Sequence, residues 1–294
     1  MARDLSKGNG LEKDKMTKMK IQGLVLCGVA LSMAACAEPG PTPDEAMQEQ
    51  LAEVEQEFFF NPSGFGSFDA AYVDCDEYAG VGPVFNDAVV DSLVPEDYTP
   101  IDPFQNGSSR LLVAQAGSCA DIEIEGHSFG PGIFAQVGIG IVPPGTPGQG
   151  DFYQVAYATT NPLLALRLRL LGINARWAPG MTYDISNGQL NISVPRPHDF
   201  AFTLSGPITA PDPNATPNPS TTFNYYHQGK RFFGNINQEN VVEGIIFGEG
   251  SGVTLTPIGS TISDIAFSAP VSFPFFSAPE IFDRADLNVD SNAF

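Results

Sequence analysis

From Arg110 onward the chain consists of short runs in which apolar and polar residues alternate, separated by Gly, Pro and Asn. Alternation with a period of two is typical of β-strands that have one buried face. The runs include RLLVAQ, DIEIEG, IFAQVGIGIV, DFYQVAYAT, LALRLRLL, LNISV, FAFTL, TTFNYY, VTLTP, TISDIAF and VSFPFF. They form no series of βαβ units, which argues against a doubly wound parallel sheet. We therefore predict a mostly β fold, an antiparallel barrel or sandwich.

Two segments that precede these runs have the spacing of short amphipathic helices, so one or two N-terminal helices are expected. The first, TPDEAMQEQLAEVEQEFFF, begins with a T-x-x-E capping box at Thr42. The second is VFNDAVVDSLVPEDY, which Pro95 should terminate. Its predicted buried face carries Phe85, Val89 and Leu93.

The run LALRLRLL places leucines and arginines on opposite faces if it is a strand. Arg167 and Arg169 would then project side by side. Two adjacent guanidinium groups can bind a carboxylate or phosphate, so both residues are candidate ligand-binding residues. The alternative is that they pair with some of the many acidic side chains.

The N-terminus has the pattern of an exported protein. Basic residues precede an apolar stretch of 13 residues, 21–33, which is too short to span a bilayer comfortably. The stretch ends at Ala34-Ala35-Cys36. This segment resembles the lipobox of bacterial lipoproteins, which implies cleavage before Cys36 and acylation of its thiol. The alternative is an ordinary secretory peptide cut after Ala35 or Ala37.

The lipoprotein resemblance sets the expected organisation and location. It implies a signal peptide over 1–35, a lipid-anchored tether and short helix over 36–60, and a single β-rich domain over 61–294. Ala37, rather than Asp, follows the cysteine, which in this family favours the outer membrane over the inner one. We therefore expect a membrane partner through the anchor at Cys36.

Cys75 and Cys119 remain after the leader and the anchor are set aside. An even pair in an exported protein favours a disulfide, and two separate buried thiols are the alternative. Two cysteines alone do not complete a structural zinc site, so no metal is predicted. No cofactor motif is present in the sequence. The formal net charge of −20 argues against a nucleic-acid partner, because nucleic-acid binding needs a basic surface.

The segment EGHSFGPG contains G-x-S-x-G, the pattern of a serine-hydrolase nucleophile elbow, centred on Ser128. The alternating run DIEIE before it and the glycines after it favour instead a turn between antiparallel strands. Ser128 is therefore a weak catalytic candidate. Its base would come from His198 or from His227. Lys230, beside Arg231, is a second weak candidate, for Schiff-base chemistry.

Residues 90–260 resemble acetoacetate-decarboxylase-like proteins. The resemblance rests on LVPEDYTP, on RLLVAQAGSCADIEIEG and on FYQVAYATTNPLLALRLRLLGI. It implies a cone-shaped antiparallel barrel with an apolar cavity. The catalytic lysine pair of that family has no counterpart in this chain. Locally, GKRFFGNINQENVVEGIIFGEG resembles the closing strands of transferrin-binding-protein-like lipoprotein barrels.

The function predicted from these features is non-catalytic. Twenty-two phenylalanines suggest an apolar core whose barrel lumen could hold one small apolar ligand. We expect an envelope lipoprotein that binds such a ligand or an envelope partner. The alternative is an enzyme, either a serine hydrolase that uses Ser128 or an acetoacetate-decarboxylase-like barrel.

Overall fold

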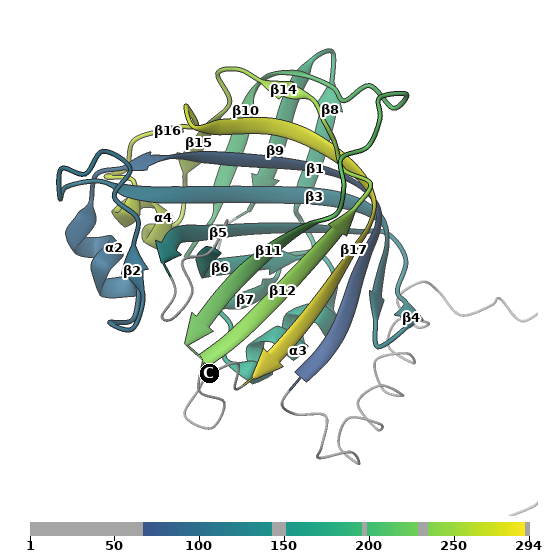
Figure 1. Cartoon of the computed structure of the whole chain (residues 1–294), viewed down its shortest axis with the longest axis horizontal. Coiled ribbons are helices and arrows are strands. Elements are labelled where there is room, and N and C mark those ends of the chain that lie inside the picture. The colour runs from purple at the N-terminus through teal and green to yellow at the C-terminus, as the bar shows by residue number, and fades with distance from the viewer. Residues whose placement is uncertain (1–66, 143–150, 196–198, 229–234, 292–294) are drawn as a thin grey trace, which may run out of the picture. The chain divides into compact units, whose positions relative to one another are not determined.

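The alternating runs form a closed barrel of seven strands (Figure 1). In order around the ring these are β5 (Gly132–Val142), β3 (Arg110–Ile124), β1 (Ser67–Val84), β17 (Phe276–Ser291), β12 (Asn235–Glu243), β11 (Thr221–Gln228) and β6 (Asp151–Thr159). Pairing of β5 with β6 closes the ring. Neighbouring strands are antiparallel except β6 and β11, which are parallel. The prediction of a mostly β fold is confirmed.

The structure is a computed structural model that describes residues 67–142, 151–195, 199–228 and 235–291. All of these belong to one unit of the chain, Met47–Phe294. The predicted leader, the anchor at Cys36 and the helix predicted to begin near Thr42 lie outside the described residues.

A second sheet packs on the outer face of the barrel, beside the long strands β1 and β3. Its strands are β16 (Val271–Ser272), β15 (Thr254–Pro257), β10 (Phe202–Thr209), β9 (Gln189–Val194), β8 (Thr182–Ser186) and β14 (Glu249–Gly250). Four short strands extend the barrel sheet: β2 (Thr99–Pro100), β4 (His127–Ser128), β7 (Ala175–Trp177) and β13 (Ile246–Phe247). The core between the sheets joins Leu112 of the barrel to Leu190 and Leu204 of the second sheet.

The close approach of the two sheets depends on Gly82. A Cβ atom at this position would lie 2.0 Å from the carbonyl oxygen of Ser272, so no larger residue fits there without movement of the backbone.

The run LALRLRLL is a helix, α3 (Pro162–Leu171), and the prediction of a strand was wrong. The Asn161 side chain accepts a hydrogen bond from the Leu164 amide, Pro162 occupies the first turn, and Gly172 ends the helix with φ 109°. These are the preferred residues for a helix start and stop. Capping on both sides therefore outweighed the alternation in the run itself.

The run TISDIAF also forms a helix, α4 (Ser260–Ile265), where a strand was predicted. Its two fully buried side chains, Ile262 and Ile265, are three residues apart. That separation is the spacing of one helix face, whereas strand neighbours on one face are two residues apart.

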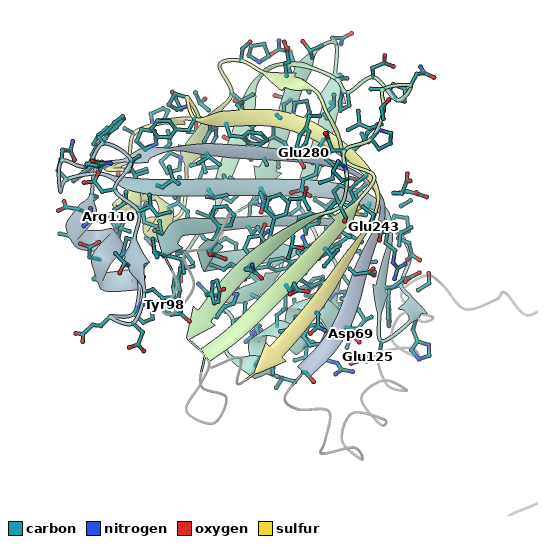
Figure 2. The ribbon with its side chains drawn as sticks, viewed as in Figure 1. Asp69, Tyr98, Arg110, Glu125, Glu243 and Glu280 are labelled. Carbon is teal, nitrogen blue, oxygen red and sulfur yellow. A yellow bond between two sulfur atoms is a disulfide. The ribbon has the colours of Figure 1, made fainter. Side chains whose placement is uncertain are left out.

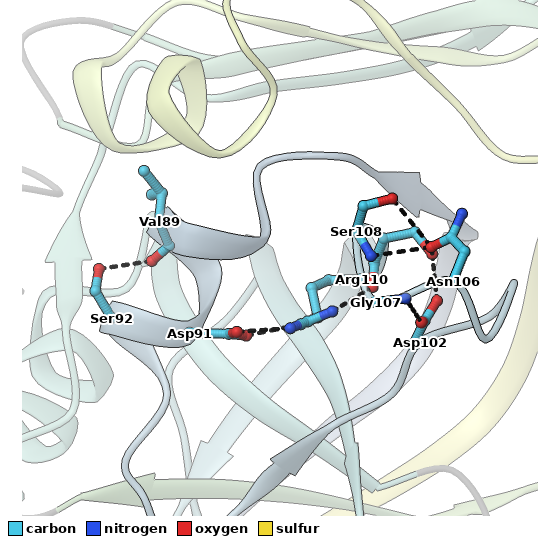
Figure 3. A network of polar contacts seen from close by, with 9 residues as sticks. Val89, Asp91, Ser92, Asp102, Asn106, Gly107, Ser108 and Arg110 are labelled. Atoms are coloured by element: carbon cyan, nitrogen blue, oxygen red, sulfur yellow. Dashed lines mark hydrogen bonds and ion pairs between the residues drawn. The ribbon is translucent and has the colours of Figure 1, made fainter.

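The helix predicted before Pro95 is present as α2 (Asp87–Leu93). Of its predicted buried face, Val89 and Leu93 pack partly buried against the core beside the fully buried Val90, whereas Phe85 is exposed and stacks on Phe104. Arg110 at the start of β3 holds the helix through two hydrogen bonds to Asp91, of 2.6 and 2.7 Å (Figure 3).

Cys75 and Cys119 form a disulfide between directly opposed residues of β1 and β3. The prediction of this bridge is confirmed. Both cysteines are buried in an apolar cluster that also contains Phe134 and Phe282.

Candidate binding site in the barrel lumen

The side chains that face the barrel lumen can be identified from strand β3. Leu112, Ala114 and Ala116 pack against the second sheet, so the alternate residues point into the barrel. Val113 accordingly contacts Phe152 of β6 and Tyr225 of β11, strands that are not neighbours of β3 in the ring. Such contacts are made across the lumen.

Six polar side chains form a layer across this lumen, which we call the polar belt. They are Glu77, Gln115, Gln136, Gln154, Tyr225 and Glu280. Each belongs to a different barrel strand: β1, β3, β5, β6, β11 and β17 in that order.

Hydrogen bonds link four members of the polar belt. The Gln136 amide nitrogen donates to Gln115 Oε1 over 2.7 Å, and the Tyr225 hydroxyl donates to the same oxygen from across the barrel. Gln154 Nε2 donates to Gln136 Oε1. This series of hydrogen bonds ends at Gln154 Oε1, which is buried and has no partner among the described residues. Because a buried acceptor without a donor is unfavourable, this oxygen indicates a position for a ligand or water donor.

Glu77 and Glu280 are the other two members of the polar belt. They are directly opposite each other in the register of β1 and β17, so their side chains are on the same, inward face. Figure 2 shows Glu280 where β17 runs beside β1. Within the described part of the chain, neither carboxyl group makes a hydrogen bond or an ion pair.

Burial dominates the ionisation of this carboxyl pair. It raises the pKa of Glu280 to about 8, and burial together with the nearby charge of Glu280 raises the pKa of Glu77 well above its ordinary value. At neutral pH the pair therefore retains a proton in the folded protein.

Four members of the polar belt keep a small exposed fraction. Glu77, Gln115, Gln136 and Glu280 each remain 5% exposed, whereas Leu112, Ala114 and Ala116 on the outer face of the barrel are 0% exposed. The layer beneath it is tightly packed: the Tyr72 and Tyr157 hydroxyls are 2.5 Å apart, and burial raises the pKa of both. The lumen was expected to be apolar, but its middle layer is polar.

Ser128 lies outside the lumen, on the exposed two-residue strand β4. It forms a hairpin with β3 in which Ser128 is opposite Glu123. Glu125 and Gly126 form the turn, both with positive φ. No hydrogen bond joins Ser128 to a histidine among the described residues. His198 and Lys230 lie outside the described residues.

Arg167 and Arg169 lie on helix α3 rather than on the face of a strand. The Arg167 guanidinium lies 5.7 Å from the centre of the Phe68 ring, and its Nη1 is 3.7 Å from Glu125 Oε1. Arg169 is in the last turn of the helix and is exposed. The structure therefore places an acid beside Arg167, as the alternative interpretation expected.

The polar belt was missed in the sequence, although a signal for it exists. Each of its glutamines interrupts an apolar strand run: VAQA at Gln115, FAQV at Gln136 and YQVA at Gln154. A glutamine on the buried side of a strand needs buried hydrogen-bond partners, and three in successive strands predict one layer.

Residues 67–142, 151–195, 199–228 and 235–291 contain no group of three or more His, Cys, Asp or Glu side chains arranged to hold a metal ion. None of the helices among them is long and apolar enough to cross a membrane.

No protein-family model matches this chain, and no curated protein sequence matches it. Solved structures with a similar fold include an acetoacetate decarboxylase-like enzyme from Sphingomonas wittichii RW1, with 13% identity, a TM-score of 0.46, and coverage of 79% of this chain and 96% of that one. Acetoacetate decarboxylase from Legionella pneumophila has 11% identity and a TM-score of 0.46, with coverage of 76% and 85%. The enduracididine biosynthesis enzyme MppR with HEPES buffer bound has 8% identity and a TM-score of 0.48, with coverage of 76% and 86%.

Proposed function

We propose that this chain is a non-catalytic binding protein that holds a small polar molecule at the polar belt of its barrel lumen. The observation that carries the proposal is a cluster of polar groups in the lumen: Gln154 Oε1 is fully buried without a hydrogen-bond partner, and the carboxyl groups of Glu77 and Glu280 make no hydrogen bond or ion pair within the described part of the chain. Burial of such groups is costly unless something else donates hydrogen bonds to them. A bound molecule with donor groups supplies that partner.

We further propose that the barrel is tethered to the bacterial envelope through an acylated Cys36. The support for this part is the basic, apolar and small-residue pattern of the leader, which resembles a lipobox. An exported protein is also the setting in which the Cys75–Cys119 disulfide is stable.

The absence of catalysis is proposed on two grounds. The catalytic lysine pair of acetoacetate-decarboxylase-like proteins has no counterpart in this sequence, whose six lysines are at positions 7, 13, 15, 18, 20 and 230. Ser128 is on an exposed antiparallel hairpin, whereas a nucleophile elbow joins a buried strand to a helix.

A second candidate function is an enzyme that transfers a proton through Glu77 and Glu280. The observation that favours it is the raised pKa of this buried pair, since buried coupled carboxyl groups are common general acids and bases. Conversion of a bound molecule by the wild-type protein, lost in Glu280→Gln, would support this candidate over binding alone.

Native mass spectrometry of the full chain purified from its own host tests the binding proposal. We expect a retained small molecule in the wild type and its loss in Gln136→Leu, which removes the centre of the polar belt at nearly constant volume. Gln189→Leu is the matched control, because Gln189 is exposed on β9. A wild type without a retained mass, or equal retention in all three proteins, would contradict the proposal.

The hydrolase alternative needs a separate test. A fluorophosphonate probe should not label the wild-type chain. Labelling that disappears in Ser128→Ala would show instead that Ser128 is a nucleophile.

A further inference from the structure

The acidic side chains of the lumen differ from those on the barrel exterior in that they have no counterion among the described residues. On the barrel exterior, Arg110 pairs with Asp91, Arg167 with Glu125, and Arg284 with Glu123 and Asp286. No arginine or lysine among the described residues pairs with Glu77 or Glu280. Two buried carboxyl groups without a cation are normally eliminated or paired, because an uncompensated buried charge is strongly destabilising.

We infer that the polar belt binds a small organic cation with N–H donors, a primary ammonium or a guanidinium, between Glu77 and Glu280. This inference rests on the proposed binding function and specifies its ligand class. A cation at this position would supply both the missing charge and the missing hydrogen-bond donors.

The remaining hydrogen-bonding groups of the polar belt agree with this class. Three groups, namely two carboxyl groups and Gln154 Oε1, are acceptors without partners among the described residues. Gln115 Oε1 already accepts two hydrogen bonds. A ligand with several donors satisfies this surplus of acceptors, whereas a carboxylate ligand would add acceptors and a like charge.

Proton linkage follows from the environment of the pair. Burial raises the pKa of Glu280 to about 8, so the empty lumen holds a proton that an incoming cation must displace. The titratable groups that interact electrostatically with the pair are four tyrosines: Tyr72 of β1, Tyr157 of β6, Tyr183 of β8 and Tyr225 of β11. The pKa of each of the four tyrosines is raised, so they stay neutral up to high pH. The carboxyl pair is therefore the group that titrates in the physiological range.

Isothermal titration calorimetry of the full chain in detergent tests the inference, with n-butylammonium as the probe. n-Butanol and n-butyrate serve as neutral and anionic controls of the same length. We expect n-butylammonium to bind most tightly, with an affinity that rises between pH 6 and pH 8 by up to about tenfold per unit as the proton is displaced. Titration in buffers with different heats of ionisation should show proton release on binding.

Variants localise the effect. Glu77→Gln and Glu280→Gln should each weaken binding of n-butylammonium about tenfold or more, since a hydrogen bond to a charged partner is lost. Glu243→Gln, on the exposed side of β12, should leave the affinity unchanged. If a lumen variant fails to fold, the pH dependence of binding and the proton release measured with the wild type still test the cation inference.

The outcomes separate this inference from the binding proposal. Equal binding of all three probes, or binding that is independent of pH and of both glutamates, overturns the cation inference. A retained neutral or anionic molecule that is lost in Gln136→Leu also overturns it, while leaving the proposed function intact. No retained molecule together with no binding of any probe overturns both.

Discussion

Glu77 and Glu280 are buried side by side without a counterion, and this arrangement has a consequence for stability. Below pH 4.5 both the folded and the unfolded chain hold the protons. Above it the unfolded chain loses them, whereas burial keeps the Glu280 proton in place up to a pKa of about 8. The folded state thus binds more protons in this interval. The free energy of unfolding of the empty protein should therefore fall as the pH rises from about 4.5 to 8.

Glu280→Gln should reduce this decrease in the free energy of unfolding with rising pH. An amide has no charge to bury, so at pH 8 we expect the free energy of unfolding of the variant to exceed that of the wild type by about 1–3 kcal/mol. Urea denaturation at pH 5 and pH 8 measures the difference. Glu243→Gln is the control, because exposed substitutions alter stability by no more than about 0.5 kcal/mol. Identical pH profiles for Glu280→Gln and wild type would show that this carboxyl group is not held protonated.

The sequence predicted the structural role of a single residue where that role depends on its neighbours in the chain. The turn at Glu125 and Gly126 follows from glycine content and strand alternation around Ser128. Glu77 and Glu280 are 203 positions apart in the chain, and only the register of β1 and β17 makes them neighbours. No local pattern contains that information.

Helix α3 is the element for which strand periodicity gave the wrong answer. LALRLRLL alternates as a strand does, but Asn161, Pro162 and Gly172 flank it with helix caps. Among its buried residues, Leu164, Leu168 and Leu171 follow the spacing of a helix. The residues that flank the run thus determine its structure. The helix-capping residues predict a helix here, although the alternation within the run predicts a strand.

The capping side chain can be tested directly. Asn161→Ala removes the acceptor for the Leu164 amide and should lower the free energy of unfolding by about 0.5–2 kcal/mol. Asn161→Ser, which retains a capping oxygen, should lose much less. Thermal or urea denaturation followed by circular dichroism measures both. Equal losses in the two variants would mean that the cap is not what stabilises α3.

The Cys75–Cys119 bridge joins β1 to β3 across a sequence separation of 44 residues. Replacement of both cysteines by alanine should lower the free energy of unfolding by about 3–4 kcal/mol in the chain-entropy model. Urea denaturation of the variant and of the oxidised wild type provides the comparison. Unchanged stability in the variant would contradict a structural role for the bridge.

For the whole molecule, the fold class was predictable and the closure of the barrel was not. Alternating runs indicate strands, but the parallel pairing of β6 with β11 and the antiparallel pairing of β1 with β17 join segments that are far apart in the chain. The polar belt depends on that closure, because it is assembled from six different strands. An apolar lumen was the natural expectation from a phenylalanine-rich sequence, since composition does not say which side chains face inward.

The proposed tether is also a property of the whole chain. The intact mass of the protein isolated from host membranes should correspond to a chain that begins at Cys36 and carries fatty acyl groups. Cys36→Ala should move the protein from the membrane to the soluble fraction of the envelope. An unacylated N-terminus at another residue would contradict the proposed anchor.

The most direct test of the central claim is a crystal structure of the chain purified from its own host without denaturation. The account predicts electron density for a small molecule in the lumen, with donor atoms within hydrogen-bond distance of Glu77, Glu280 and Gln154 Oε1. A lumen in which these three side chains bond only to one another or to water, with the same result after soaking with n-butylammonium, would contradict it.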